Sequence, residues 1–188
     1  MLGAKKIRMV LMLAGIGIGG LVAESQAAPT AGVTLAGTQM KTLSASQVAA
    51  LDKTATSGLV SADKKSLTFR QKTVHLVVHS GPDNDMLSYR IMGLRNPTLV
   101  VPAGTTLKAL FINTDDDMMH NLRFTVQKPP FKGPVKSIGT TNLPHKSETA
   151  YHAEDLTMQV PTRAGTYTYL CTVPGHAAGG MYGTLIVR

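Results

Sequence analysis

The sequence predicts an all-β protein, a Greek-key sandwich or barrel with a short helix-containing extension at its N-terminal side. From residue 67 onward, short runs rich in β-branched and aromatic residues follow one another, and Pro, Gly and Asn-Pro separate them. Many short strands at this spacing are typical of sandwiches and barrels. Hydrophobic residues make up 43% of the 188 residues, so the chain can bury a core. We expect an N-terminal extension over residues 28–70 and one β-domain over residues 71–188.

The first 27 residues have the pattern of a targeting segment. Three basic residues between positions 5 and 8 precede the apolar run from Met9 to Ala23, and Ser25 and Ala27 are small, as a signal peptidase requires. An uncleaved membrane anchor is the alternative, because the apolar run is only a little shorter than the roughly 17 to 25 residues of a spanning helix. The glycines within the run disfavour a permanent helix. Both alternatives place the folded part outside the cytoplasmic membrane.

The elements are expected in the following order. A polar lead over residues 28–42 precedes a short helix, for which Ser44 or Ser46 could be the N-cap and Val48–Leu51 supply an apolar stripe before Gly58. The strands follow as nine runs: Leu67–Phe69, Thr73–Val78, Ser88–Met92, Thr98–Val101, Thr106–Ile112, Leu122–Val126, Leu156–Val160, Gly165–Leu170 and Gly183–Arg188.

The chain is basic, with a formal net charge of +8 at pH 7. Removal of residues 1–27 takes away three basic residues and one acidic residue, so the remainder stays basic. This balance favours an acidic partner surface or an anionic membrane face. The lysines and arginines form no dense run and no aromatic residues alternate with them, so we expect no nucleic-acid binding.

The single cysteine limits the possible chemistry. One thiol in an exported chain cannot form an internal disulfide, so it is buried and inert, paired with another molecule, or used in a site. A cysteine-rich zinc site, a cysteine-ligated iron–sulfur cluster and a dinuclear copper centre bridged by two thiolates all need more cysteines.

Cys171, His176 and Met181 lie five residues apart in one short loop near the C-terminus. A mononuclear blue-copper site needs one thiolate, two imidazoles and a weak axial thioether. His120 is the best candidate for the second imidazole, because it follows the strand predicted to end at Ile112. Taken singly, a buried cysteine, a core methionine and a polar histidine are ordinary structural residues. Their combined spacing predicts one type 1 copper ion held by these four residues.

Several segments carry a resemblance to the cupredoxins, the family of type 1 blue-copper proteins, and within it most closely to the rusticyanins of acidophilic iron-oxidising bacteria. They are Asn96–Gly104, Phe111–Thr114, Ala164–Tyr169 and Cys171–Gly183, in the same order as in that group. The resemblance implies a Greek-key cupredoxin β-sandwich wrapped by an N-terminal extension, and the ligands His120, Cys171, His176 and Met181.

The resemblance also implies a function and a place in the cell. We expect a periplasmic carrier, not an enzyme, that passes single electrons between a c-type cytochrome and a downstream cytochrome or terminal oxidase in a respiratory chain. A monomer is expected, either soluble or anchored to the outer face of the inner membrane through its N-terminal segment. A membrane-attached, oxidase-associated cupredoxin is a close alternative.

One residue departs from the rusticyanin pattern. Asn121 stands where rusticyanins have serine, as in most other cupredoxins, and we expect it to tie the two ligand segments together near Thr172 and to tune the sulfur. In the loop, Pro174 should stiffen the turn and the glycines should let the backbone pass close to the metal. His176 should be the ligand nearest the surface, within an apolar collar of Pro174, Ala177, Ala178 and Met119 that could meet a partner.

The remaining acidic and histidine residues have simpler interpretations. Asp115–Asp117 predict a solvated turn, with a docking patch or an electrostatic preference for Cu(II) as alternatives. His75 and His79 are expected on a strand and His145 and His152 in a loop, all without a ligand role.

Other functions agree less well with the sequence. A cysteine hydrolase is disfavoured because Cys171 ends a strand, whereas nucleophilic cysteines usually lie at a helix N-terminus or beside a cation. A copper oxidase or nitrite reductase would need a second, all-histidine copper site. The alternative from another class is a periplasmic copper storage or delivery protein, which would bind copper through exposed, exchangeable ligands.

Overall fold

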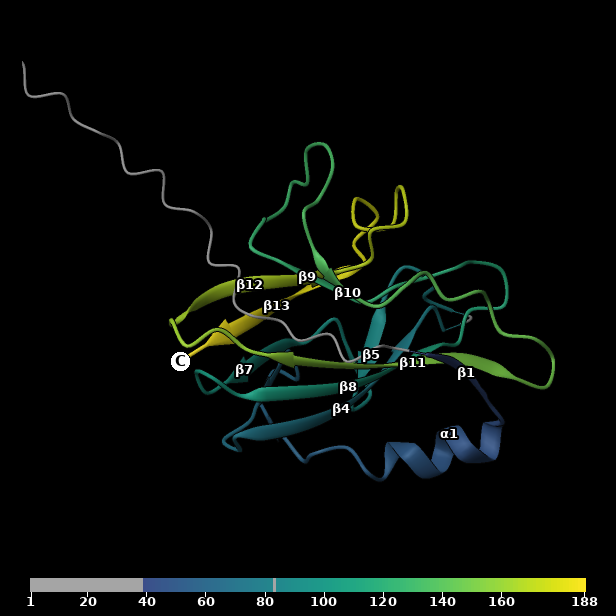
Figure 1. Ribbon diagram of the computed structural model, residues 1–188, viewed down its shortest axis with the longest axis horizontal. Coiled ribbons are helices and arrows are strands. Elements are labelled where there is room, and N and C mark those ends of the chain that lie inside the picture. Colours follow the sequence, from purple (N-terminus) through teal and green to yellow (C-terminus); the bar gives the residue numbers. More distant parts are fainter. Residues whose placement is uncertain (1–38, 83) are drawn as a thin grey trace, which may run out of the picture.

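The computed structural model describes residues 39–82 and 84–188. The predicted targeting segment and most of the polar lead lie outside these residues. Within these residues two β-sheets face each other, and the one helix lies on the outside of one of them (Figure 1). The predicted all-β sandwich is therefore confirmed. No helix in the described part of the chain is long and apolar enough to cross a membrane.

Sheet A is the six-stranded sheet that carries the helix. Its order is β1 (Met40–Leu43), β11 (Tyr151–Gln159), β8 (Thr106–Asn113), β4 (Thr73–Ser80), β5 (Tyr89–Ile91) and β6 (Leu94–Arg95). The long central strands β4 and β8 run parallel to each other, and β11 pairs antiparallel with β8. Parallel neighbours need crossover connections, and here the chain passes through sheet B between β4 and β8.

Sheet B is the seven-stranded sheet that carries the C-terminus. Its order is β10 (Ile138–Gly139), β9 (Arg123–Thr125), β12 (Gly165–Leu170), β13 (Tyr182–Val187), β7 (Thr98–Val101), β3 (Ser66–Thr68) and β2 (Leu59–Val60). The antiparallel pair β12–β13 holds the two ends of the loop over residues 171–181 side by side.

The main core lies between the two sheets. Side chains alternate along β8, so Leu107, Ala109 and Phe111 enter this core while Leu110 and Ile112 point to the opposite face. On that opposite face a smaller cluster forms beneath the helix. Because both faces of β8 are covered, its second half is a continuous buried run rather than an alternating one.

The helix α1 (Ala45–Asp52) begins as expected, with Ser44 rather than Ser46 as its N-cap. Ser44 and Gln47 form a reciprocal capping box, which satisfies two backbone N–H groups at the start of the helix. Of the predicted apolar stripe, Val48 alone is buried in the cluster beneath the helix, and Leu51 packs against its edge.

The structure corrects the prediction for two neighbouring strands at one edge of sheet A. Residues 40–43 are not part of a polar lead but form β1, which pairs with β11. The strand β11 begins at Tyr151, five residues earlier than predicted, so His152 lies in a strand and not in a loop. Because β1 and β3 join opposite sheets, the described part of the predicted extension is built into the sandwich.

Candidate metal centre

His120 lies between β8 and β9, where its backbone is held by another segment. Its N–H donates to the carbonyl of Leu143 at 3.1 Å, and the Leu143 N–H donates back to the His120 carbonyl at 2.8 Å. The Asn113 side-chain amide, at the end of β8, donates to the carbonyls of Leu143 and Pro144. This bridge fixes the direction in which the His120 side chain leaves the backbone.

Cys171 and His176 lie in the loop between β12 and β13, and Met181 closes it. The Cys171 N–H donates to the Met181 carbonyl at 3.1 Å, and the Met181 N–H donates to the His176 carbonyl at 3.0 Å. Gly175 adopts φ +88°, a left-handed conformation that glycine permits. A Cβ at Gly175 would meet no other protein atom within 4 Å, so the positive φ is what favours glycine here.

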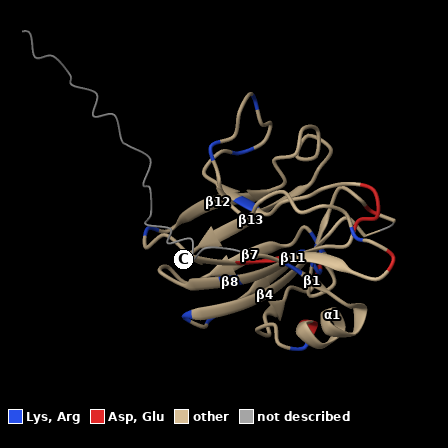
Figure 2. Cartoon of the chain, turned by 45° about the vertical axis from the view of Figure 1, so that its right-hand side comes forward, with Lys and Arg blue, Asp and Glu red and all other residues tan. Residues whose placement is uncertain are grey.

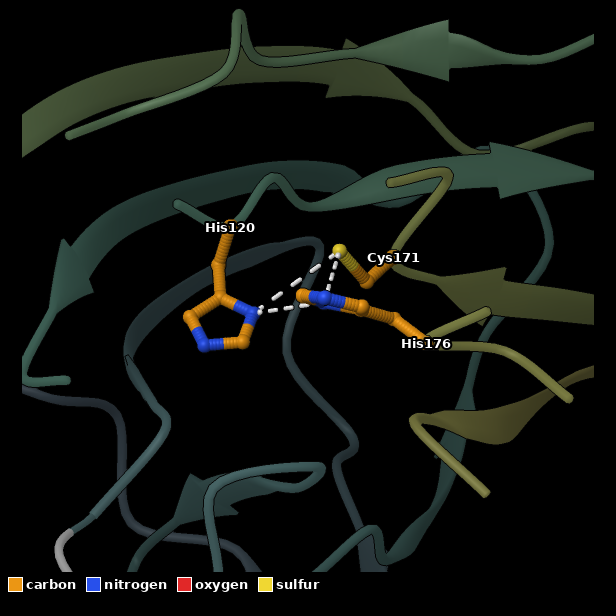
Figure 3. Close-up of side chains that lie close together, drawn as sticks. All are labelled: His120, Cys171 and His176. Carbon is orange, nitrogen blue, oxygen red and sulfur yellow. Dashed lines mark hydrogen bonds between the residues drawn. The ribbon is translucent and has the colours of Figure 1, made fainter. Parts of the chain in front are cut away.

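The three side chains converge from opposite directions, as Figure 3 shows. The Nδ1 atoms of His120 and His176 are 3.1 Å apart, and Cys171 Sγ lies 3.9 Å from the first and 3.5 Å from the second. Among the residues that the structure describes, these three form the one cluster of potential metal ligands, with their ligand atoms within 4.8 Å of one another.

The dimensions of this triangle fit a metal ion. A point about 2 Å from all three atoms lies inside it, and about 2 Å is the length of a metal–nitrogen or metal–sulfur bond. One sulfur and two imidazole nitrogens are the donors that a trigonal copper site requires. Met181 is fully buried in the same core cluster as Cys171.

The site is nearly closed to solvent. His120, Cys171 and Met181 are 0% exposed and His176 is 8% exposed. His176 is therefore the member of the group nearest the surface, as expected from the sequence. On the same loop Pro174 and Ala178 are exposed, and Met119, directly before His120 in the sequence, is half exposed.

Burial sets the protonation of the metal-free site. It lowers the pKa of His120, although the hydrogen bond to Asp115 opposes this, and it lowers the pKa of His176 together with the neighbouring His120. Burial raises the pKa of the Cys171 thiol, and backbone hydrogen bonds from Asn121 and Val173 offset only part of this effect. At neutral pH both imidazoles are thus uncharged and offer lone pairs, while metal binding must displace the thiol proton.

Asn121 makes the tie that the sequence predicted. Its side-chain amide donates to Thr172 Oγ1 at 2.9 Å, and the Thr172 N–H donates to Asn121 Oδ1 at 2.9 Å. The same amide also donates to Asn142, on the segment that holds His120. The Tyr89 hydroxyl donates to the Asn121 carbonyl from the core below. The two segments that supply the cluster are therefore joined directly.

The sequence predicted a solvated turn at Asp115, with a docking patch or an electrostatic preference for Cu(II) as alternatives. The prediction is wrong for this residue: Asp115 is 0% exposed, and its Oδ2 lies 2.9 Å from His120 Nε2. The turn is solvated only at Asp116 and Asp117. The signal in the sequence was the position of Asp115, two residues after the end of β8 at Asn113 and five residues before His120.

The other histidines described do not join the cluster. His75 is exposed on β4, and His79 on the same strand pairs with Asp52 of α1 at 2.7 Å. His145 is exposed, and His152 is half-buried in β11.

Comparison with known proteins agrees with this geometry. The model of the family "Copper binding proteins, plastocyanin/azurin family" matches residues 83–188. Rusticyanin of Acidithiobacillus ferridurans is 38% identical over 137 residues, which cover 70% of this chain and 71% of that protein. Rusticyanin of Acidithiobacillus ferrooxidans is 37% identical over 134 residues, covering 68% and 84%.

The fold is also that of solved rusticyanin structures. The 1.27 Å structure of rusticyanin from Thiobacillus ferrooxidans superposes with a TM-score of 0.71 at 33% identity, covering 80% of this chain and 97% of that one. A structure of reduced rusticyanin gives a TM-score of 0.70 at the same identity and covers all of that chain. The chain therefore belongs to the plastocyanin/azurin family of copper-binding proteins, and it is a rusticyanin-like cupredoxin, an electron-transfer copper protein.

Proposed function

We propose that the chain is a periplasmic carrier of single electrons with one type 1 copper ion, which His120, Cys171 and His176 would hold, with Met181 as a weaker fourth ligand. The observation that carries the proposal is the convergence of two imidazole nitrogens and one sulfur on a point at bonding distance from all three. Copper, when bound there, supplies a one-electron exchange between Cu(II) and Cu(I).

The surroundings of the site favour electron transfer over copper storage. An electron carrier works best when its ligands move little between the two oxidation states, whereas a storage or delivery protein needs ligands that exchange. Here the ligand atoms are buried, both ligand segments are held by backbone hydrogen bonds, and Asn121 joins them. These features support a metal that is retained.

We further propose that partners dock over His176. The exposed Pro174, Ala178 and Met119 supply an apolar surface around the ligand nearest the solvent. Beside it, the loop between β9 and β10 projects from the molecule and carries basic residues (Figure 2). The exposed lysines of this loop are Lys128, Lys132 and Lys136.

A ring contact places the basic loop next to the proposed docking face. Phe131, within that loop, packs edge-on against Tyr182, with 5.4 Å between ring centroids, and Tyr182 directly follows Met181. The combination fits a redox partner with an acidic rim, such as a c-type cytochrome or a terminal oxidase. The periplasmic location is supported by the targeting pattern of residues 1–27, which also leaves open an anchor to the inner membrane.

The proposal is tested by the optical spectrum of the full chain loaded with Cu(II). An intense visible thiolate-to-copper band that disappears on one-electron reduction and returns on oxidation is the expected result. Cys171→Ala should abolish the band, and the matched variant His145→Ala, at an exposed histidine outside the cluster, should keep it. Met181→Leu should retain copper but shift the reduction potential.

A different spectrum would contradict the proposal. Weak absorption alone, with copper that a chelator removes easily, would identify a storage or delivery protein. A band that persists in the Cys171→Ala variant would show that the sulfur ligand has been assigned wrongly.

A further inference from the structure

A buried carboxylate contacts the side of His120 that faces away from the cluster. Asp115 Oδ2 lies 2.9 Å from His120 Nε2, and both side chains are 0% exposed. His120 Nδ1, on the other side of the same ring, is the atom that faces Cys171 and His176. Asp115, the imidazole of His120 and the proposed metal position therefore follow one another in a line of contacts.

The other oxygen of Asp115 is also occupied by donors. The N–H groups of Asp117 and Met118 both donate to Oδ1, at 2.8 and 2.9 Å. An ionised carboxylate accepts on both oxygens, whereas an amide in its place would present an NH2 group to one set of donors. With Oδ1 satisfied by the backbone and no proton on Oδ2, the bond to His120 requires that Nε2 carries the proton and donates it.

The pair is also enclosed by the backbone. A Cβ added to Gly81 would lie 2.5 Å from Asp115 Oδ2 and 2.7 Å from His120 Nε2, and Gly81 has φ +63°. A glycine at this position lets the backbone directly after β4 lie against the hydrogen bond. Water is thereby kept from the one contact that orients the imidazole.

We propose that Asp115 is a positioning residue for the metal centre, which fixes His120 as the Nε2–H tautomer and stabilises the oxidised metal relative to the reduced one. Fixing the proton on Nε2 leaves the Nδ1 lone pair free for the metal. The negative charge behind the ring increases the basicity of His120 and favours Cu(II), which carries one more positive charge than Cu(I). The inference rests on the proposed copper function and adds a determinant of its reduction potential.

The first test compares two variants of the full chain that lose the same charge in the same turn. Asp115→Asn should raise the reduction potential and weaken Cu(II) binding roughly 10- to 100-fold, the range found when partners of metal-bound histidines are changed. Asp116→Asn, at an exposed position, should leave both quantities near the wild-type values. An Asp115→Asn potential equal to that of the wild type, with the visible band intact, would overturn the proposal.

A second test needs neither copper nor a variant. In the metal-free wild-type chain, long-range ¹H–¹⁵N NMR correlations of the histidine rings should show His120 as the Nε2–H tautomer. Detection of the Nδ1–H tautomer would refute the positioning role even if Asp115→Asn fails to fold. Absence of the visible band in the loaded wild-type chain would instead refute the proposed function, so the two failures are distinguishable.

Discussion

At the scale of single residues, Asn121 acts on both ligand segments at once. Its amide and carbonyl exchange hydrogen bonds with Thr172, directly after Cys171, while its own backbone directly follows His120. The distance between the two imidazoles and the sulfur thus depends on a side chain that is not itself a ligand candidate. An amide suits this position because it donates and accepts at the same time.

Replacement of the Asn121 amide should weaken the connection between the two ligand segments. Asn121→Ser is too short to keep both bonds to Thr172, so we expect the free energy of unfolding to fall by roughly 1 to 3 kcal/mol, measured by urea unfolding. Thr172→Val removes one of the same bonds. The double variant should therefore lose less than the sum of the two single variants, and strictly additive losses would show that the pair does not act as a unit.

Single residues also show which positions of the site could be predicted from the sequence and which could not. His120, Cys171 and His176 were predicted together because a thiol, an imidazole and a thioether at fixed spacing in one loop leave little choice for the missing donor. The burial of Asp115 was missed because three consecutive aspartates have the composition of a solvated turn. Its burial depends on donors from Asp117, Met118 and His120, which only the folded turn brings together.

At the scale of elements, the connection between β4 and β5 depends on one carboxylate. Asp85 accepts hydrogen bonds from Arg90 of β5 at 2.9 Å and from Arg95 of β6 at 2.7 and 3.0 Å. The side chain of Asp85 is 20% exposed. These bonds hold the short hairpin of β5 and β6 at the edge of sheet A.

The contribution of Asp85 to the free energy of unfolding should be lost at low pH. The hydrogen bond from Arg95 holds the pKa of Asp85 below its ordinary value of 3.8, although burial opposes this. The stabilisation is therefore complete above pH 3.8 and is lost as the pH falls through the folded-state pKa. Asp85→Asn should cost about 1 kcal/mol in urea unfolding at neutral pH, and the difference from wild type should vanish in strong acid.

A second acidic residue provides the control for this prediction. Asp155→Asn removes a pair with Lys41 between two exposed side chains, so its cost at neutral pH should be smaller. Equal costs for the two variants, or an Asp85 effect that persists in acid, would contradict the assigned role.

The elements that were predicted correctly share a physical property. Runs such as Thr106–Ile112 and Gly165–Leu170 are rich in β-branched and aromatic residues, and each became a strand. The strands β2, β6 and β10 have two residues each, too few to show a period. The start of β11 was missed because His152, Glu154 and Asp155 resemble a loop, yet Glu154 is buried and accepts hydrogen bonds from Thr141.

At the scale of the whole molecule, the proposed ligands join distant parts of the chain. His120 follows a strand of sheet A, whereas Cys171 and His176 lie at the end of a hairpin in sheet B. A bound metal would close a loop of about fifty residues and connect the two sheets at one end of the sandwich. Binding of this kind stabilises the folded state because the unfolded chain has no such site.

Removal of the metal should therefore lower the thermal stability. At a free copper concentration 1,000 times the Kd, the expected stabilisation is about 4 kcal/mol, visible as a higher Tm in the loaded chain than after treatment with a chelator. The Tm of Cys171→Ala should respond far less to copper. An equal rise in Tm for this variant would place the stabilising site elsewhere.

If partners dock over His176, charges on the neighbouring loop should affect the rate at which a partner reduces the copper-loaded chain. Lys132→Glu reverses a charge on the loop beside Tyr182 and should slow reduction of the copper-loaded chain by a reduced c-type cytochrome, most strongly at low salt. Lys108→Glu makes the same charge change in β8, away from its Asn113 end. Stopped-flow rates that fall equally for both variants would indicate a general charge effect and not a local docking face.

The short outer strands of both sheets have a consequence for how the protein behaves in a crowded compartment. Within the described residues, sheet A ends in β1 and β6 and sheet B in β10 and β2, and these strands have between two and four residues. Long unpaired edges are templates on which further copies add and aggregate. The outermost strands therefore offer little length on which a second copy could add.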